Sequence, residues 1–120
     1  MSDDATIYDL EERTARFGEA VIDFSLNIRR NAITCPLISQ LVRSATSIGA
    51  NYCEANEAGT KKEFKYRVGV SRREAKETKF QLRMVVAAAK EKKEEARPLW
   101  KEAHELNLIF AAIFRKTKAE

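Results

Sequence analysis

The chain has 120 residues, of which 33% are charged and 44% hydrophobic, and its net charge is +4. Only four glycines and two prolines interrupt it, so the composition predicts long amphipathic helices in a single domain. Two cysteines are too few for a disulfide framework, no apolar run reaches the ~20 residues of a membrane span, and the acidic start has no apolar signal core, so we expect a cytoplasmic protein without membrane contact.

The first two predicted helices cover residues 6–30 and 36–56. In 6–30, apolar residues recur at steps of three and four from Ile7 to Ile28, as in a bundle helix. The second helix begins with Pro36 in its first turn, where a missing N–H costs little. Its apolar seam consists of Ile38, Leu41, Ala45, Ile48, Tyr52 and Ala55.

The third and fourth predicted helices cover residues 61–93 and 98–117. Thr60 and Glu63 form a capping box that opens the third helix, and Pro98 begins the fourth. Short connections between long helices favour antiparallel neighbours. The sequence therefore predicts one domain, residues 1–120, with an all-α fold: an antiparallel up-down four-helix bundle.

Two of the predicted helices are apolar on the side opposite their seam. An isolated bundle leaves the outer side of each helix in water, so apolar or small residues there predict an interface. We therefore expect the chain to self-associate; the alternative is that loops or chain ends shield these residues. The expected interface residues are Gly49, Cys53, Tyr66, Val70, Phe80 and Met84.

A polar strip also runs along the second predicted helix, which otherwise has little charge. An amide or carboxylate buried there without a partner would cost ~1–3 kcal/mol or more, so we expect partners in a neighbouring helix or subunit. The alternative is a pocket, such as a Mg²⁺-dependent nuclease site using Glu54, Glu74 and Glu77, but no nucleophile–base pair accompanies these carboxylates. The expected buried polar network consists of Arg43, Ser47, Asn51, Glu54, Ser71, Glu74 and Glu77.

Positive charge is concentrated in residues 57–90, which carry 10 basic and 4 acidic side chains. Seven cations fall on one edge of the third helix, and a row of this kind can follow a phosphate backbone. No aromatic residue interleaves with them, so base stacking is not indicated. The alternative is a solvated face paired with acids of the first or fourth helix. This basic stripe consists of Lys61, Lys65, Arg72, Lys76, Lys79, Arg83 and Lys90.

Motifs of catalysis and cofactor binding are missing from the sequence. The single histidine, His104, has no ligand partners at metal-site spacing, and there is no glycine-rich phosphate loop or catalytic triad. We expect no enzymatic activity, cofactor or metal. We expect a bundle that contacts RNA or DNA; the alternatives are a scaffold that binds only proteins and, third, the Mg²⁺-dependent carboxylate enzyme.

The stretch "RSATSIGANYCEANEAGTKKEFKYRVGVSRREAKET", residues 43–78, resembles the bacterial four-helix-bundle proteins encoded in 23S rRNA intervening sequences. Their pattern runs R-S-x-T-S-I-x-A-N-Y-x-E-A, then S-K-K-E-F, then K-E-A-x-E-T. Thr60 and Arg73 stand where Ser and Lys are usual, and Phe80 and Gln81 replace a Tyr-Trp pair. The matching residues are Arg43, Ser44, Thr46, Ser47, Ile48, Ala50, Asn51, Tyr52, Glu54, Ala55, Lys61, Lys62, Glu63, Phe64, Glu74, Ala75, Glu77 and Thr78.

This resemblance implies an antiparallel four-helix bundle that assembles as a homopentamer and has no established enzymatic activity. A similar bundle is the accessory protein of diversity-generating retroelements, in which a basic pentamer contacts nucleic acid and a reverse transcriptase. We accordingly expect the partners to be further copies of the chain, and RNA, DNA or another protein.

Overall fold

A computed structural model describes the backbone of residues 3–119 and the side chains of residues 10–119. These residues form four α-helices and one turn of 3-10 helix, and they contain no strand. None of the helices is long and apolar enough to cross a membrane. The elements are α1 (Asp3–Leu26), α2 (Thr34–Asn56), α3 (Lys61–Ala88), η1 (Lys90–Lys92) and α4 (Lys93–Lys116).

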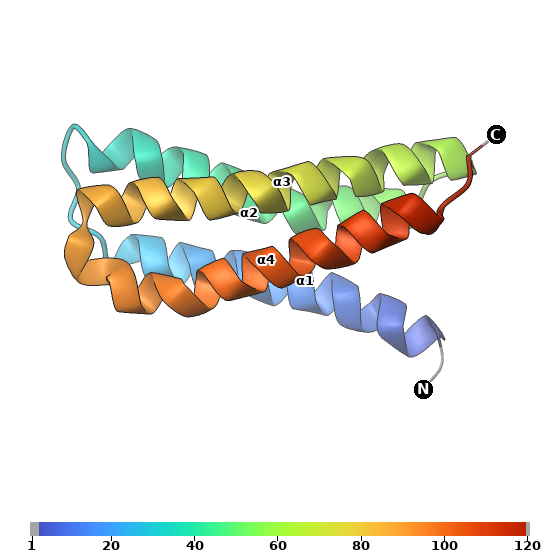
Figure 1. Ribbon diagram of the computed structural model, residues 1–120, viewed down its shortest axis with the longest axis horizontal. Helices are drawn as coiled ribbons and strands as arrows, with labels where there is room; N and C mark the ends of the chain where they lie inside the picture. Colours follow the sequence, from blue (N-terminus) through green and yellow to red (C-terminus); the bar gives the residue numbers. More distant parts are fainter. Residues whose placement is uncertain (1–2, 120) are drawn as a thin grey trace.

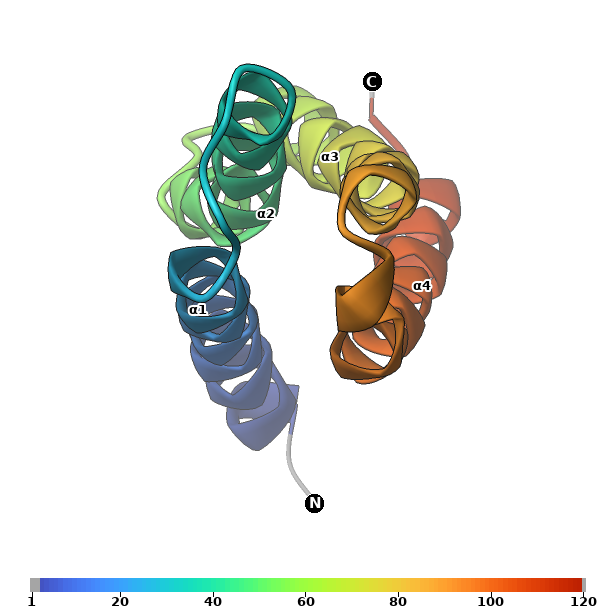
Figure 2. The ribbon, with the colours of Figure 1, turned by 90° about the vertical axis from the view of Figure 1, so that its left-hand side faces the viewer.

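The helices lie side by side along the 47 Å length of the molecule, and the start of α1 and the end of α4 lie at the same end (Figure 1). Viewed along the helices, α1, α2, α3 and α4 follow one another around a common axis (Figure 2). The α2–α3 pair is therefore central, with α1 packed on α2 and α4 packed on α3. This arrangement is a helical bundle, as the sequence predicts.

The core consists of the seams that the sequence predicts. In α2 all six predicted seam residues are buried, and in α3 the buried set runs from Val68 to Val85 at steps of three and four. Thr14 of α1 is 2% exposed and fills the one polar place in its seam, whereas the predicted first seam residue, Ile7, lies outside the described side chains. Phe110 of α4 closes the core, with its ring centroid 5.4 Å from that of Tyr52.

The connection between α1 and α2 is longer than predicted. Helix α1 ends at Leu26 rather than residue 30, and α2 begins at Thr34, two residues before Pro36. The reason is an Asx turn: Oδ1 of Asn31 accepts hydrogen bonds from the N–H groups of Ile33 and Thr34, at 2.8 and 2.9 Å. The buried Thr34 hydroxyl then donates to the Arg29 carbonyl at 2.7 Å, which fixes the turn to the end of α1.

The connection between α3 and α4 also differs from the prediction. Helix α3 ends at Ala88, and α4 begins at Lys93, so Pro98 lies inside α4 rather than at its start. The ring removes the N–H that would bond to the Glu94 carbonyl, but this loss falls in the second turn, near the helix start. Burial of Ala96, which is 4% exposed, holds that first part of the helix against the bundle.

Candidate nucleic-acid interface

The basic stripe lies along the junction of α3 with α4. Six of its seven residues are on α3, whereas Lys90 lies in η1 because α3 ends two residues earlier. Among the described side chains, no carboxylate forms an ion pair with any of the seven. Within residues 10–119, the stripe is therefore not paired with acids of α1 or α4. The exposed members are Lys61, Lys76, Arg83 and Lys90.

The other three cations of the stripe are half-buried against aromatic rings of α4. Lys65 Nζ lies 4.6 Å and Arg72 Cζ 4.9 Å from the centroid of the Phe114 ring. At these distances the negative face of the ring attracts each cation. Lys65 and Arg72 are thereby fixed in place without losing their positive charge.

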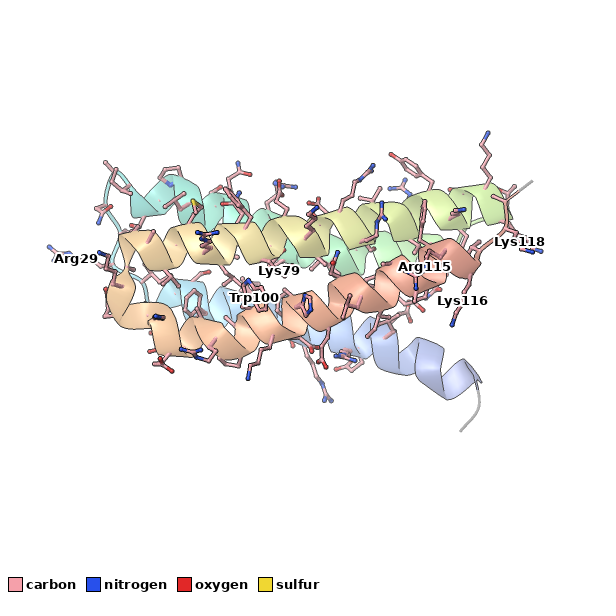
Figure 3. All side chains as sticks on the ribbon, viewed as in Figure 1. Arg29, Lys79, Trp100, Arg115, Lys116 and Lys118 are labelled. Atoms are coloured by element: carbon pink, nitrogen blue, oxygen red, sulfur yellow. The ribbon has the colours of Figure 1, made fainter. Side chains whose placement is uncertain are left out.

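Lys79 makes the corresponding contact nearer the η1 end of the junction. Its Nζ lies 5.3 Å from the Trp100 ring centroid and donates a hydrogen bond to Nδ1 of His104 at 3.0 Å. Trp100 stacks on His104 with the two planes 13° apart, and Figure 3 shows Lys79 of α3 facing Trp100 of α4. No aromatic residue interleaves with the stripe on α3 itself, but α4 brings Trp100 and Phe114 against it. A helical wheel of α4 could have found Trp100, His104 and Phe114, which share one edge.

Three shallow grooves, of about 300 to 380 Å³, follow the α3–α4 junction. Each is lined by at least three basic side chains and, within the part of the chain that the structure describes, by no carboxylate. The two grooves beside α1 differ, because Glu11 and Glu19 line one and Glu12 and Glu102 line the other. The positive side of the molecule is thus the α3–α4 junction.

The predicted polar network separates into parts that do not contact one another. At the α2–α3 junction, Arg43 Nη1 donates to Glu74 at 3.0 Å and the second terminal nitrogen pairs with Glu77. The hydrogen bond to Glu74 is the main reason why the pKa of Arg43 is raised. Arg43 is exposed, so this part of the network is a surface ion pair rather than a buried one.

The remaining network residues have other partners. Asn51 donates to the Ser47 carbonyl at 2.9 Å and accepts from Arg67 Nη1 at 3.1 Å, a partner that the sequence did not indicate. Ser71 is fully buried and donates across the seam to the Ile48 carbonyl at 2.9 Å. Glu54 is exposed within one subunit, in contrast to its predicted burial.

The six expected interface residues also have different surroundings. Gly49 is buried by α1, since a Cβ there would lie 2.9 Å from the Thr14 hydroxyl, and it is unavailable to another subunit. Its small size serves the close approach of α1 instead. Cys53 is exposed beside the α1–α2 groove, where partial burial and the nearby Glu11 raise the pKa of its thiol.

The outer face of α3 leaves aromatic surface in water. Tyr66 is 60% and Phe80 56% exposed, whereas Val70 and Met84 are half-buried. Because α3 is continuous, Arg73 and Glu77 lie on the same side between the two apolar pairs. The apolar outer face is therefore divided in two by charged residues.

The described residues contain no group of three or more His, Cys, Asp and Glu side chains that could hold a metal ion. Glu74 and Glu77 of the alternative nuclease site both face Arg43, and Glu54 does not join them. These carboxylates therefore form no cluster of metal ligands in the subunit.

Comparison with protein families agrees with the motif in α2 and α3. Residues 9–112 match the model of the 23S rRNA-intervening sequence protein family. The chain belongs to this family. Its match covers most of α1 and α4 as well as the central helices, and so includes the basic stripe, Trp100 and His104, but ends before Phe114.

A solved structure has the same fold as this family member. It is a crystal structure of a protein of unknown function from the S23 ribosomal protein family of Bacteroides thetaiotaomicron, with a TM-score of 0.78 and 23% sequence identity. The match covers 88% of this chain and 98% of that chain. The comparison with curated proteins found no match.

Proposed function

We propose that this chain is a non-enzymatic, self-associating helical bundle that contacts RNA or DNA through the basic stripe of α3. The observation that carries the proposal is the absence of carboxylate partners along the stripe and its grooves, within residues 10–119. Seven like charges without counter-charges repel one another, and an external polyanion would relieve that repulsion. The retroelement accessory proteins offer an analogy at the level of fold.

Binding of this kind depends on salt because each neutralised phosphate releases a counterion. A variant with Gln at all four exposed stripe positions should lose retention of RNA and DNA in a filter assay at low salt. The slope of log affinity against log salt concentration should also become less steep, by up to about 3. The variant positions are Lys61, Lys76, Arg83 and Lys90.

A matched control removes the same number of exposed cations away from the stripe. Four exposed cations line none of the three α3–α4 grooves, and their replacement by Gln changes the net charge equally: Arg16, Arg29, Arg30 and Arg43. If both variants lose retention equally, binding depends on net charge alone and not on the position of the stripe.

Self-association is proposed on the exposed aromatic surface of α3. Tyr66 and Phe80 present large apolar area to water, which a copy of the chain would cover. The up-down antiparallel order and the assembly of five copies are implied by the family resemblance. Light scattering should give a mass that is a multiple of the 13.7 kDa of one chain. Phe80→Glu should reduce this mass, whereas Leu108→Glu, on the exposed surface of α4, should not.

The second candidate function is a scaffold that binds proteins and no nucleic acid. The same exposed α3 surface favours it, since an apolar face serves a different partner as well as a copy. An assembly that retains neither RNA nor DNA at low salt would select this function. Mg²⁺-dependent hydrolysis lost in Glu54→Gln would instead select the carboxylate enzyme.

A further inference from the structure

The groove at the η1 end of the α3–α4 junction combines an apolar floor with a basic rim. It measures about 380 Å³, and Leu82, Val86 and Ala96 line its floor. Within the described residues, Arg97 is the one rim cation with an ion pair, to the exposed Glu94 at 3.1 Å. The rim cations are Arg83, Lys93, Arg97 and Lys101.

Trp100, the single tryptophan of the chain, borders this groove and is 42% exposed. Its ring stacks on His104, one turn later in α4, and Lys79 holds the His104 ring through Nδ1. Ala96 and Arg97, which line the groove, lie one turn before Trp100. The indole is thus supported on one side by His104 and borders the groove on the other.

We propose that this groove binds one unpaired base of a single-stranded nucleic acid, stacked on Trp100, with the flanking phosphates on the four rim cations. An aromatic platform inside a positive groove is how single strands are held without regard to sequence. The volume lies within the range of about 300–1,000 Å³ that is usual for ligand sites. The inference rests on the proposed function, because the strand reaches the groove along the basic stripe through Arg83, which belongs to both.

The exposed Trp100 ring is the reason to expect a single strand rather than another polyanion. In a duplex the base faces are already stacked on one another, so only phosphates could meet the rim. An acidic peptide would use the cations but has no need of a flat indole beside them. A single strand is the partner whose chemistry uses both features.

The single tryptophan makes the site directly observable. Oligothymidine, which does not pair with itself, should quench the Trp100 fluorescence, and a DNA duplex of equal length should not. Thymidine monophosphate should quench only at far higher concentration, because it lacks the neighbouring phosphates. If thymidine monophosphate quenches at the same concentration as oligothymidine, the proposal of a single-strand site is overturned, and the groove is a site for free nucleotides.

Replacement of the ring separates stacking from charge. Trp100→Leu keeps an apolar side chain and should weaken oligothymidine retention about fivefold or more, with duplex retention unchanged. Leu108→Ala truncates a comparably exposed apolar residue of α4 and should change neither. If circular dichroism shows that Trp100→Leu has unfolded, the double variant Lys93→Gln and Lys101→Gln keeps the ring and should lower the single-strand salt slope by about 1.4.

The outcomes distinguish this site from the proposed function. Retention that depends on the stripe but is equal for single strand and duplex, with no quenching, overturns the base site and leaves the proposed function intact. Unchanged single-strand affinity in Trp100→Leu, when folded, has the same meaning. Failure of the chain to retain either nucleic acid at low salt overturns both.

Discussion

Helices α1 and α4 are attached to the central α2–α3 pair in different ways. On α4, Leu106 and Phe110 are fully buried, so large apolar side chains join it to the core. Glycines on both helices allow α1 to approach α2 closely: a Cβ at Gly18 of α1 would meet Thr46, and one at Gly49 of α2 would meet Thr14. Both outer helices thus bury large apolar side chains, Phe17 and Val21 on α1 among them, but α1 also approaches its neighbour closely at two glycines.

Ion pairing also differs between the contact of α1 with α4 and the junction of α3 with α4. Where α1 meets α4, Arg13 pairs with Glu102 at 2.7 Å and with Glu105 at 3.1 Å. Along the α3–α4 junction, Lys76 and Arg83 have no such partner among the described residues. Arg13 is thus neutralised by carboxylates of α4, whereas Lys76 and Arg83 are available to an external anion.

The largest effect is expected at the core contact of α4. Phe110→Ala should lower the free energy of unfolding by about 3–5 kcal/mol, because a fully buried ring that packs on Tyr52 leaves a cavity. Urea unfolding followed by circular dichroism measures the loss. Leu108→Ala, on the exposed side of the same helix, should stay within about 0.5 kcal/mol. Similar losses in both would mean that α4 is not held by buried volume.

The contact of α1 with α2 can be tested at its glycines. Gly49→Ala places a methyl group 2.9 Å from Oγ1 of Thr14, a buried side chain fixed by its bond to Glu11. This overpacking should cost about 1–3 kcal/mol, more than the ~1 kcal/mol that alanine gains in a helix. Urea unfolding should therefore give a net loss of stability.

Two other glycines serve as controls for that substitution. Gly18→Ala meets Thr46 at an ordinary 3.6 Å and should gain stability by about 0.5–1 kcal/mol. Gly69→Ala approaches Phe114 at 3.0 Å, but that half-buried ring can rotate away, so its effect should be close to zero. A gain at Gly49 would show that α1 can move outward from α2 without loss.

The seams could be predicted from the sequence because their period repeats over many turns. Leu41, Ala45 and Ile48, for example, are fully buried as predicted. The surroundings of Gly49 could not be predicted, because a wheel of α2 alone leaves two sides free and does not say which neighbour covers each. Tertiary packing decides that α1 takes the side with the small residues.

The candidate site was predicted in part for a related reason. Lys79 and Arg83 fall on one edge of α3 by helical period alone, so the stripe is visible in sequence. Its aromatic platform comes from Trp100, more than fifteen residues later and across a turn. A residue contributed by another helix becomes visible only when the register of the two helices is known.

A smaller loss is expected where α4 bonds to the backbone of α3. Asn107 Nδ2 donates to the Arg72 carbonyl at 2.9 Å, and Asn107→Ala should lower the free energy of unfolding by about 0.5–1.5 kcal/mol. Asn27 makes a similar bond to the Asp23 carbonyl at 3.0 Å, but it is exposed after α1. Asn27→Ala should therefore change the free energy of unfolding by less than about 0.5 kcal/mol. A larger loss at Asn27 than at Asn107 would contradict the importance of the bond between α4 and α3.

The ion pair between α1 and α4 should contribute less still. Glu102→Gln keeps the shape of the side chain and should cost about 0.2–1 kcal/mol at low salt, less as salt is added. Glu12→Gln removes a carboxylate that pairs with Arg16 within α1, so it should not affect the attachment of the two helices. Thermal unfolding at two salt concentrations compares them. If the stability lost in Glu102→Gln does not change with salt, the contact between Arg13 and Glu102 contributes through packing rather than through charge.

The smallest effect is expected in the reactivity of the Cys53 thiol, with no change in the stability of the fold. Cys53 borders the α1–α2 groove, where burial first and then the Glu11 carboxylate raise the pKa of its thiol. In a Cys35→Ser background, alkylation by iodoacetamide should therefore reach half its maximal rate at a higher pH than for a cysteine in a short peptide, because the thiolate is the reactive form. Glu11→Gln should move that midpoint only part of the way back, since burial remains. A complete return would show that α1 contributes charge but does not cover the thiol, which would make the contact of α1 with α2 looser than its glycines indicate.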